Sequence, residues 1–121
     1  MGRREHIMTL SDPFFFKAFY GEKTVEMRLY DEKRQKINSG DIITFFCAEN
    51  NCMTIETVVE RVRVFDDFYA LALSYPSEEL GFAGKSPREV AEFMNSLYGD
   101  RAGKYRAVAI EFIFYDEGDV I

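Results

Sequence analysis

Four polar side chains of different chemistry closely follow one glycine. Residues 21–29 read Gly-Glu-Lys-Thr-Val-Glu-Met-Arg-Leu. In a strand, successive side chains point to opposite faces, so Thr24, Glu26 and Arg28 would share one face, with roughly 6–7 Å between neighbours. Lys23 lies beside them, at a turn that Gly21 permits because it has no Cβ. We therefore expect a hydroxyl, a carboxylate, a guanidinium and an ammonium to lie together at one open end of the fold.

These groups suit the recognition of a flat, anionic ligand. Arg28 is a planar fork that matches a phosphate or a base edge, and Lys23 is a mobile point charge. Glu26 can accept a hydrogen bond from an exocyclic amine or hold Arg28 in place. Two other interpretations are a solvated strand face and a Glu26–Arg28 ion pair that only stabilises the strand. Exposed ion pairs contribute only about 0–1 kcal/mol to stability.

Catalysis would require a different charge state at Lys23. An amine acts as a base or nucleophile only when it is neutral, which requires burial or a nearby cation. Arg28 would favour the neutral amine, whereas Glu26 would favour the ammonium. A lysine beside Glu26 is therefore a charged anchor by default.

The segments around this motif must hold it against a core. Val25, Met27 and Leu29 form the apolar face of the same strand. A short strand over 6–10 precedes it, and a helix is expected over 13–20, after a Ser-Asp-Pro start and before Gly21.

Residues 14–16 of that helix are all phenylalanine. Three consecutive positions span about 200° of a helix, so the three rings cannot all enter one core stripe. One of them, with Phe15 as the candidate, either lines a cleft beside Lys23 and stacks on a flat ligand, or packs under a loop.

The rest of the chain supplies further strands. A turn at 38–41 leads into a buried strand over 42–47. A long strand over 53–65 changes its apolar phase near 57–59, which predicts a β-bulge. The last strand, over 105–115, is apolar enough to pair on both sides, with Val108, Ile110, Phe112 and Phe114 pointing inward.

Two further helices are expected between the last two strands. Asp66 is the candidate cap of the first helix, and Pro76 ends it. The second helix begins with a Ser-Pro-Arg-Glu capping box at 86–89 and closes at Gly99. The expected core positions are Phe68, Leu71, Ala72 and Tyr75 in the first helix and Val90, Phe93, Met94 and Leu97 in the second.

These segments predict an α+β fold, namely a small mixed β-barrel with two or three flanking helices. Bulged, bent strands are how small barrels close. The length of 121 residues fits a single domain over 1–121. Residues 116–121 are expected to be a frayed acidic tail.

Composition narrows the class of protein. Apolar residues make up 47% of the chain and charged residues 30%, which is typical of a globular protein. No apolar run approaches the ~20 residues that a membrane span needs, so we expect a cytoplasmic protein that does not enter membranes.

Cys47 and Cys52 are expected to be reduced structural thiols. No metal or cofactor is expected, because His6 is the single histidine and lies far from the two cysteines in sequence.

Charge is distributed unevenly along the chain. The net charge is −6, but residues 1–48 hold eight basic and seven acidic residues, whereas 49–121 hold seven basic and fourteen acidic ones. Affinity for nucleic acids depends largely on phosphate neutralisation, so tight non-specific binding to duplex DNA is not expected. Any contact with a polyanion should be local, around Lys17, Lys23, Arg28, Lys33, Arg34 and Lys36.

The pattern Gly21-x-Lys23-x-x-Glu26-x-Arg28 resembles the signature of the ASCH domain, a member of the PUA-like superfamily. The preceding strand and Phe-rich helix, and the Gly40-Asp41 turn into an apolar strand, fall where that family has them. The late helix and the closing strand also match, so the resemblance extends over nearly the whole chain.

The resemblance implies a PUA-like barrel that binds RNA or a nucleotide-like ligand, in a cleft between the first helix and the strand of Lys23 to Arg28. One bacterial branch of the family is an amidohydrolase that removes the acetyl group of N4-acetylcytidine with a lysine, a threonine and a glutamate. Lys23 matches that lysine. The threonine position is Glu26 here, with Thr24 one pleat away, and the glutamate would be Glu78 or Glu79.

Two functions follow as hypotheses. The first is a binding module for single-stranded RNA, a modified nucleotide or a similar small anion, with Lys23, Thr24, Glu26, Arg28 and Phe15 as ligand-binding residues. The second is a small amidohydrolase of an acylated nucleoside such as N4-acetylcytidine. Its catalytic residues would be Lys23, Glu26 and Glu79, with a glutamate as general acid/base and Lys23 attacking or stabilising an oxyanion.

Overall fold

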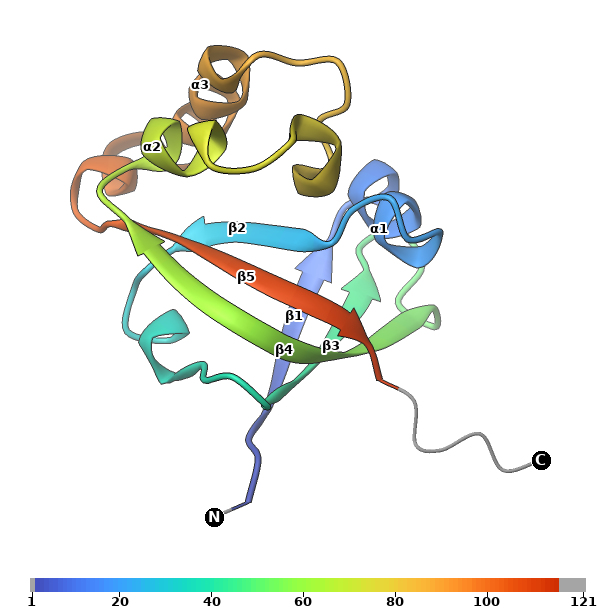
Figure 1. The fold of residues 1–121 in the computed structure, drawn as a ribbon. Helices are drawn as coiled ribbons and strands as arrows, with labels where there is room; N and C mark the ends of the chain where they lie inside the picture. Colours follow the sequence, from blue (N-terminus) through green and yellow to red (C-terminus); the bar gives the residue numbers. More distant parts are fainter. Residues whose placement is uncertain (1, 116–121) are drawn as a thin grey trace.

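A single five-stranded mixed sheet organises residues 2–115, which the computed structural model describes (Figure 1). The strand order is β1-β3-β4-β5-β2, with β1 parallel to β3 and the other neighbours antiparallel. The strands are β1 (Glu5–Leu10), β2 (Val25–Leu29), β3 (Ile42–Cys47), β4 (Thr54–Phe65) and β5 (Ala107–Phe114).

Three helices flank the sheet. Helix α1 (Asp12–Phe19) connects β1 to β2, while α2 (Phe68–Leu73) and α3 (Pro87–Tyr98) lie between β4 and β5 in the chain. In Figure 1, α2 and α3 pack together above one end of the sheet, and the described chain ends leave from the opposite side. Three short 3-10 turns complete the fold: η1 (Arg34–Lys36), η2 (Ser77–Leu80) and η3 (Gly99–Gly103).

The predicted α+β class is confirmed, and the barrel is a curled half-barrel. Strands β1 and β2 are the edges of the sheet, and within residues 2–115 no backbone ladder joins them. Arg28 of β2 instead donates a hydrogen bond from Nη2 to the Thr9 carbonyl oxygen of β1, at 2.9 Å. A side chain therefore bridges the seam between the two edges.

The bend in the sheet comes from β4, as the change of apolar phase predicted. Its register against β5 shifts between Val59 and Arg61, the signature of a β-bulge. Strand β5 pairs with β4 on one side and β2 on the other, which confirms that it is central. The last residue of β5 differs from the prediction: Phe114 is expected to point inward, but it is 50% exposed and does not enter the core.

Apolar residues gather into two cores. One lies inside the curl against α1 and contains Phe15, Phe45 and Ile110. The other lies between the sheet and α2 and α3, and it contains the predicted apolar face of β2: Val25, Met27 and Leu29. That face is confirmed, since none of these side chains is more than 3% exposed.

Helix caps follow the sequence with one correction. Ser86 and Glu89 form the predicted capping box of α3. Asp66 does not cap α2; the cap is Asp67, whose Oδ1 accepts from the Ala70 backbone N–H at 2.8 Å. Asp66 instead pairs with Arg106. The two adjacent aspartates offer the same chemistry, so only the backbone could decide between them.

Two of the expected core residues of α3 are also corrected. Val90 and Met94 are buried, and so is Ala91, but Phe93 is 45% exposed and Leu97 is 64% exposed. The predicted tail at 116–121 lies outside the described residues. Among the helices of the described part of the chain, none has the length and apolarity to cross a bilayer.

Gly81, which ends η2, lies close to two side chains on other segments. Its φ is +89°, and a Cβ there would come within 3.0 Å of Phe14 Cδ1 and 3.1 Å of Lys23 Cδ. Alanine would therefore be strained in the backbone and would crowd neighbours that are already packed.

We predict that Gly81→Ala lowers the free energy of unfolding by more than Gly84→Ala does. Gly84 has a similar φ of +83° but open space around its missing Cβ, so it isolates the backbone strain. We expect a loss of about 1–2 kcal/mol from the left-handed backbone in both variants and a further 1–3 kcal/mol, roughly, from crowding at Gly81 alone. Urea unfolding of the two variants measures the difference, and equal losses would contradict the packing role of Gly81.

Candidate functional site

The polar face of β2 lies in the seam of the half-barrel, and it is buried. Glu26 is 5% exposed and Lys23, at the preceding turn, is 3% exposed. The turn forms as the sequence predicted, with Gly21 at a φ of +85°. The structure therefore brings Lys23, Glu26 and Arg28 together, in a burial that the sequence did not indicate.

Three oxygens surround the Lys23 ammonium. Its Nζ lies 3.0 Å from Glu26 Oε1, and it donates to the carbonyl oxygens of Val25 (2.8 Å) and Leu80 (3.0 Å). An ammonium has three N–H donors and no acceptor, so this set of partners fits the charged form. A neutral amine would place its lone pair against an oxygen.

Glu26 joins the two cations through its two oxygens. Oε1 faces Lys23, and Oε2 accepts from Arg28 Nε at 2.5 Å. Arg28 also spans the seam to Thr9, as described above. The residues that the structure describes provide no partner for Arg28 Nη1, so this end of the guanidinium keeps free donors.

Lys23, Glu26 and Arg28 form a triad of ion pairs, and its burial shifts the pKa values of its members. Burial lowers the pKa of Lys23, and the Glu26 carboxylate opposes that shift. Burial alone would raise the pKa of Glu26, but Lys23 and Arg28 lower it further than burial raises it. Glu26 is therefore a carboxylate at neutral pH, and the triad carries one net positive charge.

A pocket of about 430 Å³ opens beside the triad. This size is typical of small-ligand sites. Its lining combines the triad with aromatic, apolar and hydroxyl side chains from β1, β2, α1, α3 and two connecting segments. The lining residues are Thr9, Leu10, Ser11, Phe14, Lys23, Glu26, Met27, Arg28, Phe82, Phe93, Met94, Leu97 and Tyr98.

Aromatic rings form one wall of the pocket. The rings of Phe14 and Phe82 lie 5.1 Å apart between centroids, and Phe82 lies 5.1 Å from Phe93. The ammonium groups of Lys17 and Lys23 both lie within 5.8 Å of the Phe14 ring centre. The aromatic wall therefore begins, at Phe14, directly beside the cationic end of the pocket, which Lys23 and Arg28 form.

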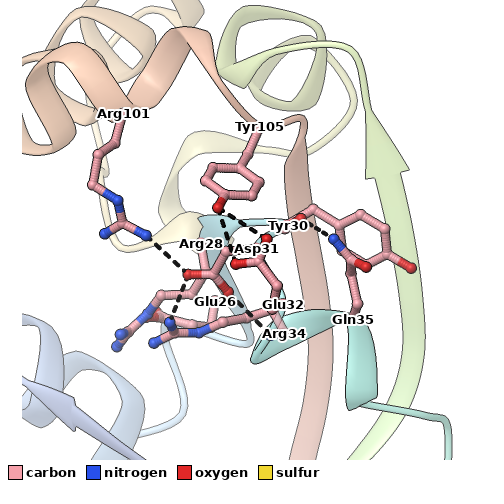
Figure 2. A network of polar contacts seen from close by, with 9 residues as sticks. All are labelled: Glu26, Arg28, Tyr30, Asp31, Glu32, Arg34, Gln35, Arg101 and Tyr105. Atoms are coloured by element: carbon pink, nitrogen blue, oxygen red, sulfur yellow. Dashed lines mark hydrogen bonds and ion pairs between the residues drawn. The ribbon is translucent and has the colours of Figure 1, made fainter.

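The cationic end continues onto the loop after β2 (Figure 2). Asp31 is only 6% exposed and lies between Arg34 of η1 and Arg101 of η3. Both guanidinium groups contact Asp31 Oδ2, each at 3.2 Å. The charged segment 31–36 is therefore anchored by a buried carboxylate, Asp31, although most of its side chains are exposed.

Phe15 is not a pocket residue, which corrects the candidate chosen from the sequence. It is fully buried in the core inside the curl, and Phe14 lines the pocket in its place. The expectation that the three rings would diverge is met, since Phe16 is only partly buried.

Thr24, Glu78 and Glu79 do not join the triad pocket. Thr24 and Glu79 line a second hollow of about 460 Å³, next to Tyr75, which follows α2, and to Arg63 and other residues of β4 and β5. The Thr24 backbone N–H donates to the Glu79 carbonyl oxygen at 2.9 Å, which fixes the two segments side by side. Glu78 is exposed.

Several lining residues were not predicted from the sequence. Phe82 lies in a loop, and Phe93 and Tyr98 lie on α3. Sequence periodicity placed Phe93 in the core because a pocket wall and a core face have the same apolar spacing. The available signal was an excess of apolar positions on α3, where Val90, Ala91 and Met94 already cover the core.

One group of side chains has the spacing of a metal site. Asp12, Cys47 and Glu49 place ligand atoms within 4.8 Å of one another. Hydrogen bonds already account for this cluster: Cys47 Sγ donates to Asp12 Oδ1 (2.9 Å), and Glu49 Oε1 accepts from the Asp12 backbone N–H (2.8 Å). The bond to Asp12 and burial raise the pKa of the Cys47 thiol, which disfavours the thiolate that binds metals. Cys47 and Cys52 are both free thiols.

Comparisons with solved structures give two relatives at 30% identity. This chain is similar to the crystal structure of hypothetical protein PH0355, with a TM-score of 0.80 over 92% of this chain and 99% of that chain. It is also similar to the solution NMR structure of PF0455 from Pyrococcus furiosus, with a TM-score of 0.66 over 93% and 98% of the two chains.

A third solved structure carries the family's name in its title. It is the crystal structure of a ZmASCH mutant from Zymomonas mobilis, which is 20% identical with a TM-score of 0.65, over 92% of this chain and 68% of that chain. At that identity the similarity shows the fold alone.

No curated protein matches the chain. The family model of the ASCH domain matches residues 8–114. Because this match spans most of the chain and the half-barrel fold agrees with it, the chain belongs to the ASCH domain family.

Proposed function

We propose that the triad pocket binds RNA or a nucleotide-like ligand. The observation that carries this proposal is a buried ion-pair triad with a net positive charge, open on an aromatic-lined pocket. A flat base would pack against Phe14, Phe82 and Phe93, and a polar or anionic group would face Arg28.

The three charged residues have different roles in this proposal. Both oxygens of Glu26 are already engaged, so Glu26 holds the two cations and does not read an exocyclic amine. Lys23 has no free donor and acts as a fixed positive charge below the ligand. Arg28 keeps the free Nη1 donors, which makes it the residue that contacts the ligand directly.

A purely structural role explains the triad less well. Buried ion pairs pay a large desolvation penalty, and apolar residues of the same volume often stabilise a fold equally well or better. The pocket beside the triad would have no use in that interpretation. The expected weakness towards duplex DNA remains part of the proposal, because the chain carries a net charge of −6.

The alternative is an amidohydrolase acting on an acylated nucleoside such as N4-acetylcytidine. Its chemistry would need either a neutral Lys23 that attacks or an ammonium with a donor free to face an oxyanion, together with a glutamate free to move a proton. In the structure Lys23 is enclosed by three oxygens, Glu26 is engaged by two cations, and Thr24 and Glu79 lie at the second hollow. This geometry favours binding over hydrolysis.

We predict that Arg28→Ala and Phe93→Ala each weaken binding of short single-stranded RNAs or nucleotides by roughly tenfold or more. The first variant removes charge-assisted hydrogen bonds, and the second removes a stacking surface; each interaction is worth about 1–3 kcal/mol. Calorimetric or fluorescence titration of an RNA and nucleotide panel measures the change.

Two variants serve as matched controls for this titration. Arg61→Ala removes an ion-paired arginine at the second hollow, and Tyr69→Ala removes a ring that is 43% exposed, against 45% for Phe93. Both should bind like the wild type. Unchanged affinity in Arg28→Ala and Phe93→Ala, with the fold intact by circular dichroism, would show that the ligand site is assigned to the wrong place.

We predict no release of cytidine from N4-acetylcytidine, even at high enzyme concentration. The assay is chromatographic separation of the two nucleosides after long incubation, with Lys23→Ala measured in parallel. Turnover by the wild type that disappears in Lys23→Ala would establish the hydrolase in place of the binding module.

The ionised state of the triad predicts a specific pH dependence of stability. The folded pKa of Glu26 lies below its ordinary value of 4.5. Its stabilising contribution is therefore complete above about pH 4.5 and is lost as the pH falls through the folded pKa. We expect Glu26→Gln to cost about 3–5 kcal/mol at neutral pH, because it leaves two buried cations unpaired. This difference from the wild type should shrink as the solution is acidified below pH 4.5.

Urea unfolding from pH 3 to pH 7, roughly, measures this dependence for the wild type and for Glu26→Gln. Glu92→Gln, at an exposed position of α3, is the control. A difference between wild type and Glu26→Gln that stays constant across the whole range would mean that Glu26 is not an ionised partner of Lys23 and Arg28.

A further inference from the structure

The arginines around Asp31 have no assigned role in the proposed pocket. Arg34 and Arg101 come from segments 67 positions apart in sequence, and both contact the same Asp31 oxygen. One carboxylate therefore balances two guanidinium groups. Together with the triad, these ion pairs join four cations (Lys23, Arg28, Arg34, Arg101) to two carboxylates.

One further carboxylate in this network does not cancel the excess. Glu32 is the further carboxylate of the network in Figure 2, and both of its oxygens accept from the Tyr105 hydroxyl, at 2.9 and 3.0 Å. Counting Glu32 still leaves one positive charge in excess. The exposed Lys33 and Lys36 on the same loop add to the positive side.

This cluster adjoins the cationic end of the pocket. Asp31 follows Leu29, the last residue of β2, by two positions, and Figure 2 shows Glu26 and Arg28 in the same group of side chains as Asp31, Arg34 and Arg101. Burial lowers the pKa of Arg28, but the Glu26 carboxylate and, more weakly, Asp31 raise it, in agreement with this placement. Because Arg28 also lines the pocket, the pocket and the arginine cluster meet at Arg28.

Parts of the cluster are free to contact a ligand. Arg101 is 54% exposed along its side chain and engages Asp31 only through Nη2. Arg34 Nε is buried without a hydrogen-bond partner among the described residues, so a ligand would reach this donor only if the side chain moved and gave up its Nη1 bond to Asp31. A cluster built only to cap η1 would need Arg34 and Asp31, but not Arg101.

We propose that Arg28, Arg34 and Arg101 form a phosphate subsite at the mouth of the triad pocket. The ligand class is then a phosphorylated nucleoside, either a free nucleotide or one end or link of an RNA strand, rather than an uncharged nucleoside. Planar arginine forks suit phosphate oxygens because they donate two parallel hydrogen bonds. The inference rests on the proposed function, since it places the base in the pocket and the phosphate outside it.

The test compares the four ribonucleosides with their 5′- and 3′-monophosphates by titration. We expect at least one monophosphate to bind roughly tenfold or more tightly than its nucleoside. Arg101→Gln should remove most of that advantage and leave nucleoside affinity unchanged, and Arg101→Lys should keep part of it. Raising the salt concentration should weaken the monophosphate and not the nucleoside.

Arg106→Gln is the matched control. Arg106 is 59% exposed and pairs with Asp66 at 3.2 Å, so it has nearly the exposure and pairing geometry of Arg101. Equal affinities for nucleoside and monophosphate, or equal losses in Arg101→Gln and Arg106→Gln, would overturn the subsite while leaving the pocket in place. Failure of every nucleoside, monophosphate and short RNA to bind would overturn the proposed function and the subsite together.

Discussion

The seam between β1 and β2 is closed by charged side chains in place of a backbone ladder. A half-barrel leaves two edges whose carbonyl oxygens need donors, since unpaired buried polar groups are costly. Arg28 supplies one donor across the seam to Thr9 of β1, and Lys23 supplies one donor to Val25 of β2 and one to Leu80 of η2. Two cations so close together would repel each other without Glu26 between them. The carboxylate is therefore what allows both donors to be buried.

This arrangement also orients the side chain that a ligand would meet. Arg28 is held at Nε by Glu26 and at Nη2 by Thr9, so the direction of Nη1 is fixed before any ligand arrives. A fixed guanidinium loses less conformational entropy on binding than a free one. In the proposed function, the cost of burying the triad would thus contribute to binding, which an apolar closure of the seam could not do.

Local patterns in the sequence predicted much of the fold. The alternation of β2, the bulge in β4 and the capping box of α3 each depend on residues close in sequence, and each is present. Predictions that depended on which neighbour packs where were less successful. Phe14 and Phe15 are adjacent and chemically identical, so only the docking of α1 on the sheet decides which ring is core and which lines the pocket. Thr24 precedes the first residue of β2, so the strand's alternation did not extend to it.

The aromatic wall shows why such a site is hard to recognise from one sequence. Phe93 and Leu97 follow the same helical spacing as true core residues, and periodicity reports only that a face is apolar. In the structure the core side of α3 is complete without them, and the surface they cover is left open beside a buried charge. An apolar face with more members than its core can use, next to ionisable residues on a neighbouring strand, is the combination that distinguishes a pocket wall from a core. Neither half of that combination is informative alone, because each is common in proteins without a site.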